Sequence, residues 1–175
     1  SEILESLCSV SKKVLTSASN KVTIPEFVHL KNPKTITFTE KGEAQLELKM
    51  VISPEKDKLK SLLETLLHIG NQPGIIFCNF KDTIDYISNY LFDNNISHGC
   101  FYGGMEQNDR ELALIKFRNG THQLLVATDL AARGIDIPEL KFIIHYQLPL
   151  KEHEFMHRNG RTARMNTEGT AYILK

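Results

Sequence analysis

Three arginines lie within eight residues near the end of the chain, in the segment His157-Arg158-Asn159-Gly160-Arg161-Thr162-Ala163-Arg164. If this segment is helical, His157, Arg161 and Arg164 share one face at positions i, i+4 and i+7, and Arg158 points about 100° away. Two forked guanidinium groups on one face are suited to binding phosphate oxygens. The octet contains no acidic residue that would pair them. It therefore predicts a phosphate clamp better than an ordinary exposed helix.

A second segment places polar side chains directly after the apolar run Leu124-Leu125-Val126-Ala127. Thr128 or Asp129 can cap a short helix that ends near Gly134, which brings a hydroxyl and free backbone N–H groups to the tip of a strand. Such a tip suits a sugar-phosphate backbone. Asp136 follows on a turn, where its carboxylate could accept hydrogen bonds from a ribose hydroxyl. A capped one-turn helix without a ligand is the structural alternative.

Two adjacent glycines, Gly103 and Gly104, stand between an expected strand and an expected helix. Glycine lets backbone N–H groups approach a phosphate at the N-terminus of a helix. The alternative is a tight turn that needs a positive φ. The sequence leaves both interpretations open.

The segment His153-Glu154-Phe155-Met156-His157 matches the pattern H-E-x-x-H, which on a helix brings two histidines to one face as zinc ligands. Five residues match this pattern easily by chance. No third ligand is evident downstream, so we expect no metal site here.

The elements that would position these groups form an alternating pattern of short apolar runs and amphipathic stretches, which is typical of βα units around a parallel sheet. We expect an α/β fold with helices on both faces of the sheet. The expected strands are Gln45 to Ile52, Gly74 to Cys78, Ser97 to Tyr102, Gln123 to Ala127, Lys141 to Tyr146 and Gly169 to Leu174. Three helices are expected. The first starts at Pro54 with Ser53 as its N-cap, the second covers Lys81 to Asn94, and the third covers Gln107 to Arg118. Ligands of such sheets bind beyond the carboxyl ends of the strands.

The amino-acid composition disfavours several classes of binding partner and of structural site. Among 175 residues, 21 Lys and Arg balance 21 Asp and Glu, so no basic excess supports indiscriminate binding of polyanions. The three cysteines form no C-x-x-C pair, which argues against a disulfide framework or a structural zinc. No apolar run reaches the roughly 18 residues that a membrane helix needs. We expect a cytoplasmic protein without a membrane partner.

Together the segments resemble the C-terminal RecA-like domain of DEAD-box RNA helicases over residues 42–175. The segment Gly74-Ile75-Ile76-Phe77-Cys78-Asn79 is similar to motif IV, and Gln107-Asn108-Asp109-Arg110 to the Q-x-x-R element. Residues 126–136 resemble motif V, and the arginine octet resembles motif VI. Ser17-Ala18-Ser19 resembles motif III, so residues 1–41 would be the tail of a first RecA-like domain and a linker. The chain begins without Met, and we expect it to be part of a longer protein.

The resemblance implies a role for each matching residue on the ATP side. Arg161 and Arg164 would be arginine fingers that reach the γ-phosphate of ATP and stabilise the charge of the transition state. His157 would couple to the first domain, and Arg158 would brace the interface between the two domains. The residues that would face ATP are Gly134 and Asp136, with Asp136 near the ribose. ATP and Mg²⁺ would be bound mainly through the first domain.

On the RNA side, the resemblance implies contacts with phosphates that are independent of base identity. The residues concerned are Arg110, Thr128, Gly104 and Asn79. The implied function is the second domain of an ATP-dependent RNA helicase, which couples ATP binding and hydrolysis to local unwinding of RNA duplexes or remodelling of RNA–protein complexes. The implied partners are RNA and the N-terminal RecA-like domain of the same protein, and we expect a monomer.

Several residues depart from the usual family pattern, namely Ser19, Tyr102, Asn159 and Ala163. Of these, Asn159 puts a polar side chain where packing is expected, and Ala163 replaces a glycine. The chain also has no G-x-x-x-x-G-K-[ST] loop, so this segment alone is not expected to hydrolyse ATP. Two alternatives remain. One alternative is a DNA-directed relative, but the resemblance implies that such proteins commonly carry Gln at the position of His157. The other is a non-catalytic RNA-binding adaptor, but the presence of Arg161 and Arg164 counts against it.

Overall fold

The computed structural model describes residues 13–16, 24, 28, 30, 32–36, 45–54, 57–129, 137, 140–162 and 168–175. The chain divides into two compact units, Ser1–Thr39 and Glu40–Lys175. The three residues that resemble motif III lie outside the described residues. In the first unit, the ammonium group of Lys13 donates to the carbonyl oxygen of Val28 at 2.8 Å.

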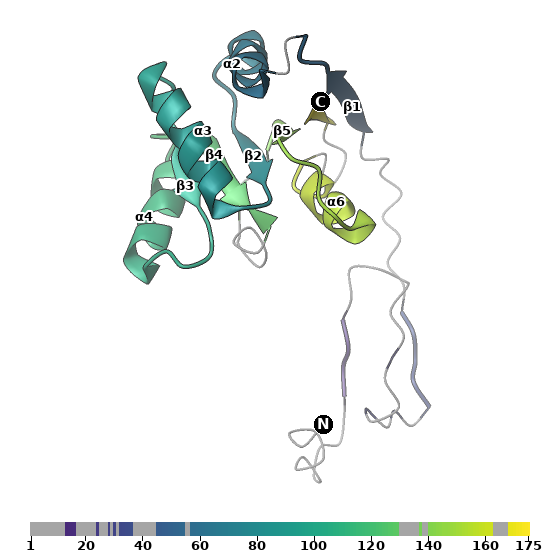
Figure 1. Cartoon of the computed structure of the whole chain (residues 1–175). Helices are drawn as coiled ribbons and strands as arrows, with labels where there is room; N and C mark the ends of the chain where they lie inside the picture. The colour runs from purple at the N-terminus through teal and green to yellow at the C-terminus, as the bar shows by residue number, and fades with distance from the viewer. Residues whose placement is uncertain are drawn as a thin grey trace. The chain divides into compact units, whose positions relative to one another are not determined.

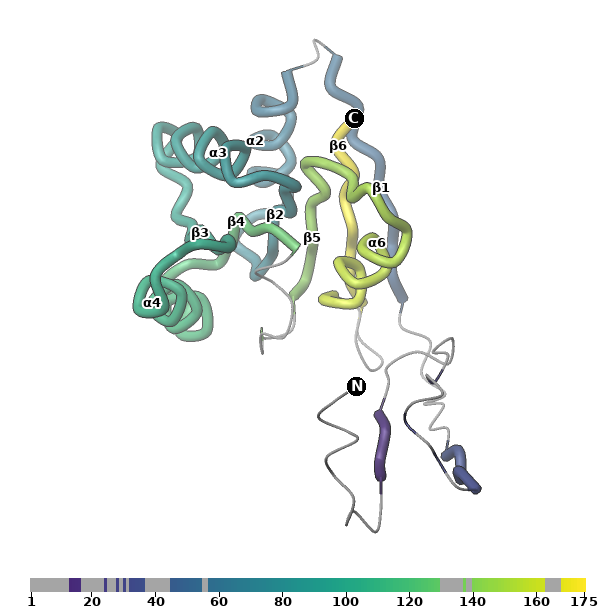
Figure 2. Tube along the Cα trace, turned by 60° about the horizontal axis from the view of Figure 1, so that its bottom comes forward, coloured from purple at the N-terminus to yellow at the C-terminus, as the bar shows by residue number. Residues whose placement is uncertain are grey.

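The second unit contains a six-stranded sheet in which every pair of neighbouring strands is parallel (Figures 1 and 2). The strands are β1 (Gln45–Val51), β2 (Gly74–Cys78), β3 (Gly99–Phe101), β4 (Leu124–Thr128), β5 (Phe142–His145) and β6 (Glu168–Leu174). Their order across the sheet is β1-β6-β5-β2-β4-β3. The first and last strands of this unit are therefore neighbours, and Figure 2 shows them side by side.

Helices cover both faces of this sheet. The helices are α2 (Lys58–Ile69), α3 (Lys81–Asp93), α4 (Gln107–Arg118) and α6 (Glu152–Asn159). Leucines of α2 and isoleucines of α3 pack on one face against Ile76, Val126 and Ile144. Phe117 of α4 packs on the other face, and there the ring of Phe155 in α6 stacks on that of His145. The predicted α/β fold is confirmed, with the central strands β2 and β5 buried between two helical layers.

The start of α2 differs from the prediction. The helix begins at Lys58, and its N-cap is Asp57, whose carboxylate accepts hydrogen bonds from the backbone N–H groups of Leu59 and Lys60. Ser53 instead extends the sheet, because its backbone N–H donates to the carbonyl oxygen of Lys175 at 2.9 Å. A carboxylate satisfies the free N–H groups of the first turn and also complements the positive end of the helix dipole.

The shared face of His157 and Arg161 was conditional on a continuous helix, and the end of α6 shows that this condition is not met. The helix stops at Asn159, so His157 and Arg161 do not share a helical face. Gly160 is the C-cap, and beyond it Thr162 forms a parallel bridge with Leu140 and donates its hydroxyl to the Leu140 carbonyl oxygen at 2.6 Å. Glycine disfavours a continuing helix, and the bridge draws the chain toward the sheet. Arg164 lies outside the described residues.

A cross-strand contact between β2 and β5 gives a test of the sheet. Gly74 lies opposite Phe142, and a Cβ atom at Gly74 would overlap the phenyl ring. We expect Gly74→Ala to lower the free energy of unfolding by about 1–3 kcal/mol, because overpacking forces the ring or the strand to shift. Urea unfolding of the purified chain would measure this. Adding Phe142→Leu should recover part of the loss, and an unchanged urea midpoint for Gly74→Ala would contradict the contact.

Candidate functional site

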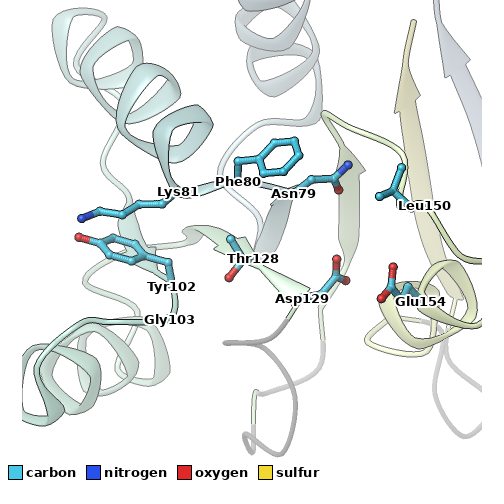
Figure 3. A pocket seen from close by; sticks show the side chains of 9 residues that line it. All are labelled: Asn79, Phe80, Lys81, Tyr102, Gly103, Thr128, Asp129, Leu150 and Glu154. Atoms are coloured by element: carbon cyan, nitrogen blue, oxygen red, sulfur yellow. The ribbon is translucent and has the colours of Figure 1, made fainter.

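A pocket of about 430 Å³ opens at the carboxyl ends of three neighbouring strands (Figure 3). Asn79 directly follows β2, Tyr102 directly follows β3, and Thr128 ends β4. The full lining consists of Asn79, Phe80, Lys81, Tyr102, Gly103, Thr128, Asp129, Leu150 and Glu154. Parallel strands bring their carboxyl ends to one edge of the sheet, so residues far apart in the sequence meet here.

Lys81 and Gly103 line this pocket, and Arg110 and Gly104 lie next to residues at the end of β3. The ammonium group of Lys81 lies 5.0 Å from the centre of the Tyr102 ring, and the guanidinium of Arg110 lies 5.0 Å from that of the Phe101 ring. Gly104 is exposed with φ +91°, a backbone conformation that favours glycine. The tight turn weighed in the sequence is therefore present. Its open surroundings leave room for a ligand to approach the backbone.

Arg158 is buried next to this pocket, with 1% of its surface exposed. Its Nε and Nη2 donate to the two carboxylate oxygens of Asp129 at 2.7 and 2.5 Å. Nη1 donates to the carbonyl oxygen of Gln147 at 2.6 Å, and Nη2 also donates to Oδ1 of Asn79 at 2.7 Å. The guanidinium further lies 5.1 Å from the centre of the Phe77 ring. One side chain of α6 thus joins the ends of β2, β4 and β5.

The partners of Arg158 all lie inside its own domain. The predicted role of Arg158 in bracing an interface with another domain stays a prediction. The sequence pointed away from an internal partner because the octet contains no acid. Asp129, 29 residues earlier, supplies the carboxylate. The carboxyl ends of parallel strands lie at one edge of the sheet, and this rule could have linked the segment of Asp129 to the arginine octet.

Asn79 also has internal partners. Its Oδ1 accepts from Arg158, its Nδ2 donates to the carbonyl oxygen of Leu148 at 2.9 Å, and its backbone N–H donates to Oε1 of Gln147 at 2.9 Å. The side chain therefore holds the loop after β5 against the end of β2. Its predicted contact with RNA stays a prediction.

The sequence of residues 57–166 matches the family model described as "Helicase conserved C-terminal domain". The chain belongs to this family. It is 35% identical over 145 residues to DEAD-box ATP-dependent RNA helicase 21 of Oryza sativa subsp. japonica, covering 82% of this chain and 20% of the relative. It is 35% identical over 150 residues to DEAD-box ATP-dependent RNA helicase CshB of Bacillus subtilis (strain 168), covering 86% of this chain and 33% of the relative. The chain thus spans a third or less of each of these two relatives.

Solved structures agree with this assignment. The C-terminal domain of the DEAD-box protein Dbp5 superposes with a TM-score of 0.67 at 28% identity, covering 76% of this chain and 77% of that one. S. cerevisiae Dbp5 bound to RNA and ADP BeF3 superposes with a TM-score of 0.68 at 28% identity, covering 76% of this chain and 36% of that one. The resemblance to the C-terminal RecA-like domain of DEAD-box helicases is confirmed, and so is its fold class.

The helicase domain contains a second buried polar pair beside Arg158. The ring of His145 is fully buried and stacked between Phe77, with ring centroids 6.4 Å apart, and Phe155, at 4.8 Å. Its Nε2 lies 2.9 Å from Oδ1 of Asn159. Because this amide oxygen can only accept, Nε2 carries a proton. Its other nitrogen, Nδ1, is buried with no hydrogen-bond partner among the described residues.

This pair explains the unusual Asn159 of the helicase domain. A polar side chain at a buried position needs a partner, and His145 supplies one across the gap between β5 and α6. Burial lowers the pKa of His145 to about 4, so the ring stays neutral near pH 7. Sequence analysis noted Asn159 but missed His145, because the two residues face each other only after α6 packs on the sheet.

The remaining predicted site residues are divided between exposed, half-buried and undescribed positions. His157 is exposed on α6, and its ring lies 6.2 Å from that of His153 in an edge-to-face arrangement. Arg161 is half-buried, one residue beyond the C-cap Gly160. Gly134 and Asp136 lie outside the described residues.

Within the part of the chain that the structure describes, no three His, Cys, Asp or Glu side chains gather as a metal site would require. No described helix is long and apolar enough to cross a membrane.

The ion pair of Arg158 and Asp129 predicts a large loss of stability when one partner is removed. We expect Asp129→Ala to lower the free energy of unfolding by about 3–5 kcal/mol, because it leaves a guanidinium buried without its counter-charge. Urea unfolding would measure the loss. Glu47→Ala is the matched control, because it removes the exposed ion pair between Glu47 and Lys49 and should leave the urea midpoint unchanged. Equal effects of the two substitutions would refute the structural role of Arg158.

Acidification should weaken the fold through His145. Its pKa is about 4 in the folded chain and about 6.5 when unfolded, so the unfolded state takes up the proton first. The stability that depends on neutral His145 is present above pH 6.5 and is lost as the pH falls toward 4. The double variant His145→Phe with Asn159→Leu removes both polar partners and should flatten this dependence. Urea midpoints between pH 7 and pH 4 would measure it, and equal slopes for variant and parent would contradict the assignment.

Proposed function

We propose that this chain is the second RecA-like domain of an ATP-dependent RNA helicase, which uses ATP to unwind short RNA duplexes or remodel RNA–protein complexes. The observation that carries this proposal is the link between the pocket and the arginine segment. Asp129 lines the pocket and binds Arg158, and Arg161 follows three residues later. A ligand at the strand ends and a nucleotide near Arg161 would therefore act on one connected set of side chains.

The pocket suits an RNA backbone. Thr128, Lys81 and Gly103 line the same pocket, with the Lys81 side chain extending toward Tyr102 (Figure 3). These groups recognise phosphate and sugar oxygens without reading base edges. Arg110, on α4, adds a guanidinium near the same end of β3. A domain with no net charge would hold RNA through such local contacts rather than through a broad basic field.

On the ATP side, Arg161 and Arg164 would act as arginine fingers, and Gly134 and Asp136 would face the nucleotide. ATP with Mg²⁺ would be held mainly by the first RecA-like domain. If ATP is bound between two domains, its hydrolysis would develop negative charge on the γ-phosphoryl group, and a guanidinium group would stabilise that charge. Closure of the two domains on ATP would bend one RNA strand, and hydrolysis would let the cleft open again. We also propose that the protein is a cytoplasmic monomer.

ATP hydrolysis by the full-length protein that contains this chain tests the proposal. The assay is titrated separately with single-stranded RNA and single-stranded DNA. Stimulation by RNA alone supports the proposal, and equal stimulation by DNA indicates a DNA-directed relative. No hydrolysis with either nucleic acid indicates a non-catalytic adaptor. The 175-residue chain alone should show only background turnover, and genuine hydrolysis by this chain would overturn the assignment.

If Arg161 is an arginine finger, Arg161→Ala should lower the turnover of the full-length protein by roughly 10³-fold or more. The cause would be the loss of charge stabilisation in the transition state, so the affinity for ATP should change much less. Steady-state kinetics at saturating RNA would measure the effect. Arg118→Ala, at the exposed end of α4, is the control and should keep full turnover. Unchanged turnover in Arg161→Ala would remove this residue from the reaction.

If Arg110 binds an RNA phosphate, Arg110→Ala should weaken RNA binding and reduce the slope of log K against log salt by about 0.7–1, the contribution of one phosphate contact. Thr128→Ala should weaken binding with an unchanged slope, because a hydroxyl releases no counterion. Fluorescence anisotropy over a series of salt concentrations would measure both. Arg110→Lys keeps the charge and should retain the parental slope. A parental slope in Arg110→Ala would place the RNA elsewhere.

A further inference from the structure

The ring of Phe80 lines the pocket, is exposed, and is not explained by packing in the core. Phe80 directly follows Asn79, lines the pocket together with Gly103 and Thr128, and keeps 61% of its surface exposed (Figure 3). It belongs to neither of the two hydrophobic clusters that the described residues form. Burial of apolar surface therefore does not account for a phenyl group at this position.

Local helix chemistry does not account for this ring either. Phe80 occupies the N-cap of α3, with φ −129° and ψ 149°, and offers no side-chain cap hydrogen bond. Ser, Thr, Asp and Asn are preferred at this position because their side chains accept a hydrogen bond from the first turn. An exposed aromatic side chain that lines a pocket is a candidate for contact with a ligand.

Other aromatic rings near the pocket are engaged or lie elsewhere. The ring of Tyr102 carries the Lys81 ammonium at 5.0 Å and packs against the cluster that includes α2 and α3. Tyr86 and Phe92 are exposed on α3, but neither lines the pocket. Among the aromatic residues that the structure describes, Phe80 alone combines high exposure with a place on the pocket lining.

We propose that Phe80 is a stacking platform for one nucleobase of the bound RNA strand. This inference rests on the proposed function and adds a base contact to a grip that otherwise holds the backbone. Thr128 and the turn at Gly103 would fix a phosphate and its sugar, and the attached base would lie against the adjacent phenyl face. Every base has a π face, so the contact strengthens binding without selecting a sequence. The pocket volume of about 430 Å³ lies within the range of small-ligand sites.

RNA binding by the full-length protein in the presence of ADP and beryllium fluoride tests this contact. The probe is a fluorescein-labelled single-stranded RNA of about 12 nucleotides, within the range of single-strand binding sites. We expect Phe80→Ala to bind it roughly 5- to 150-fold more weakly, the range that one stacked base contributes. The salt slope should stay parental, because stacking releases no counterion. Phe92→Ala, which removes a 77% exposed ring from the other end of α3, should bind as the parent does.

Single abasic sites moved along the same RNA identify the contact itself. In the parent, one abasic position should weaken binding as much as Phe80→Ala does, and in Phe80→Ala this position should become silent. Phe80→Leu keeps apolar bulk without a π face and should behave like Phe80→Ala. An abasic position that weakens parent and variant equally would overturn the inference. If Phe80 instead served a protein partner, all Phe80 variants would bind the RNA as the parent does.

Phe80→Ser separates stacking from folding. Serine is a preferred N-cap, so this variant should match or exceed the parental unfolding midpoint in urea while RNA binding falls. Parental RNA affinity in Phe80→Ser would contradict the stacking role. The proposed function fails separately: a parent protein that does not bind RNA at all refutes both proposals. Weakened binding in Arg110→Ala together with normal binding in the Phe80 variants refutes only the inference about Phe80.

Discussion

The helicase domain is organised around one buried charge. The guanidinium of Arg158 has left water almost completely, and such a group is tolerated only where a counter-charge and further acceptors surround it. Asp129, Asn79 and the carbonyl oxygen of Gln147 are those acceptors, and they come from the ends of three different strands. The position of each strand end is therefore constrained by the geometry of one planar, five-donor side chain.

Desolvation offsets much of the attraction in a buried ion pair, but each partner needs the other in place, so the pair constrains the arrangement of the elements that carry it. Here that arrangement is the relation between α6 and the sheet. The His145 and Asn159 pair contacts the same helix from β5, one residue along from Arg158. The hydrogen bonds of the consecutive residues Arg158 and Asn159 thus fix the C-terminal end of α6 on the sheet. They also fix the point from which the chain continues to Gly160 and Arg161.

Local patterns were readable from the sequence, whereas the partners of buried polar groups were not. The bounds of β2 and α4 agree with the predicted Gly74 to Cys78 and Gln107 to Arg118, because alternation and helical periodicity are properties of the segments themselves. The sequence left open whether residues 157–164 form one helix, since the bridge between Thr162 and Leu140 that competes with helix continuation depends on the sheet. Asp129 and Arg158 could be paired only after the strand order was known. Resemblance to a family supplied roles for residues, but not the internal engagement of Arg158.

The strand order also affects how the domain is made. β6 lies between β1 and β5, so among the described strands β1 has β6 as its one neighbour and cannot pair with it until β6 has been synthesised. Residues 74–145 contain β2 to β5, which pair with one another, whereas the backbone edge of β1 stays without its partner β6 until the end of this unit. Such long-range pairing is slow relative to local contacts. During synthesis, the nascent chain therefore carries β1 unpaired for nearly the whole length of the sheet, a stage at which chaperone binding and misassociation compete with folding.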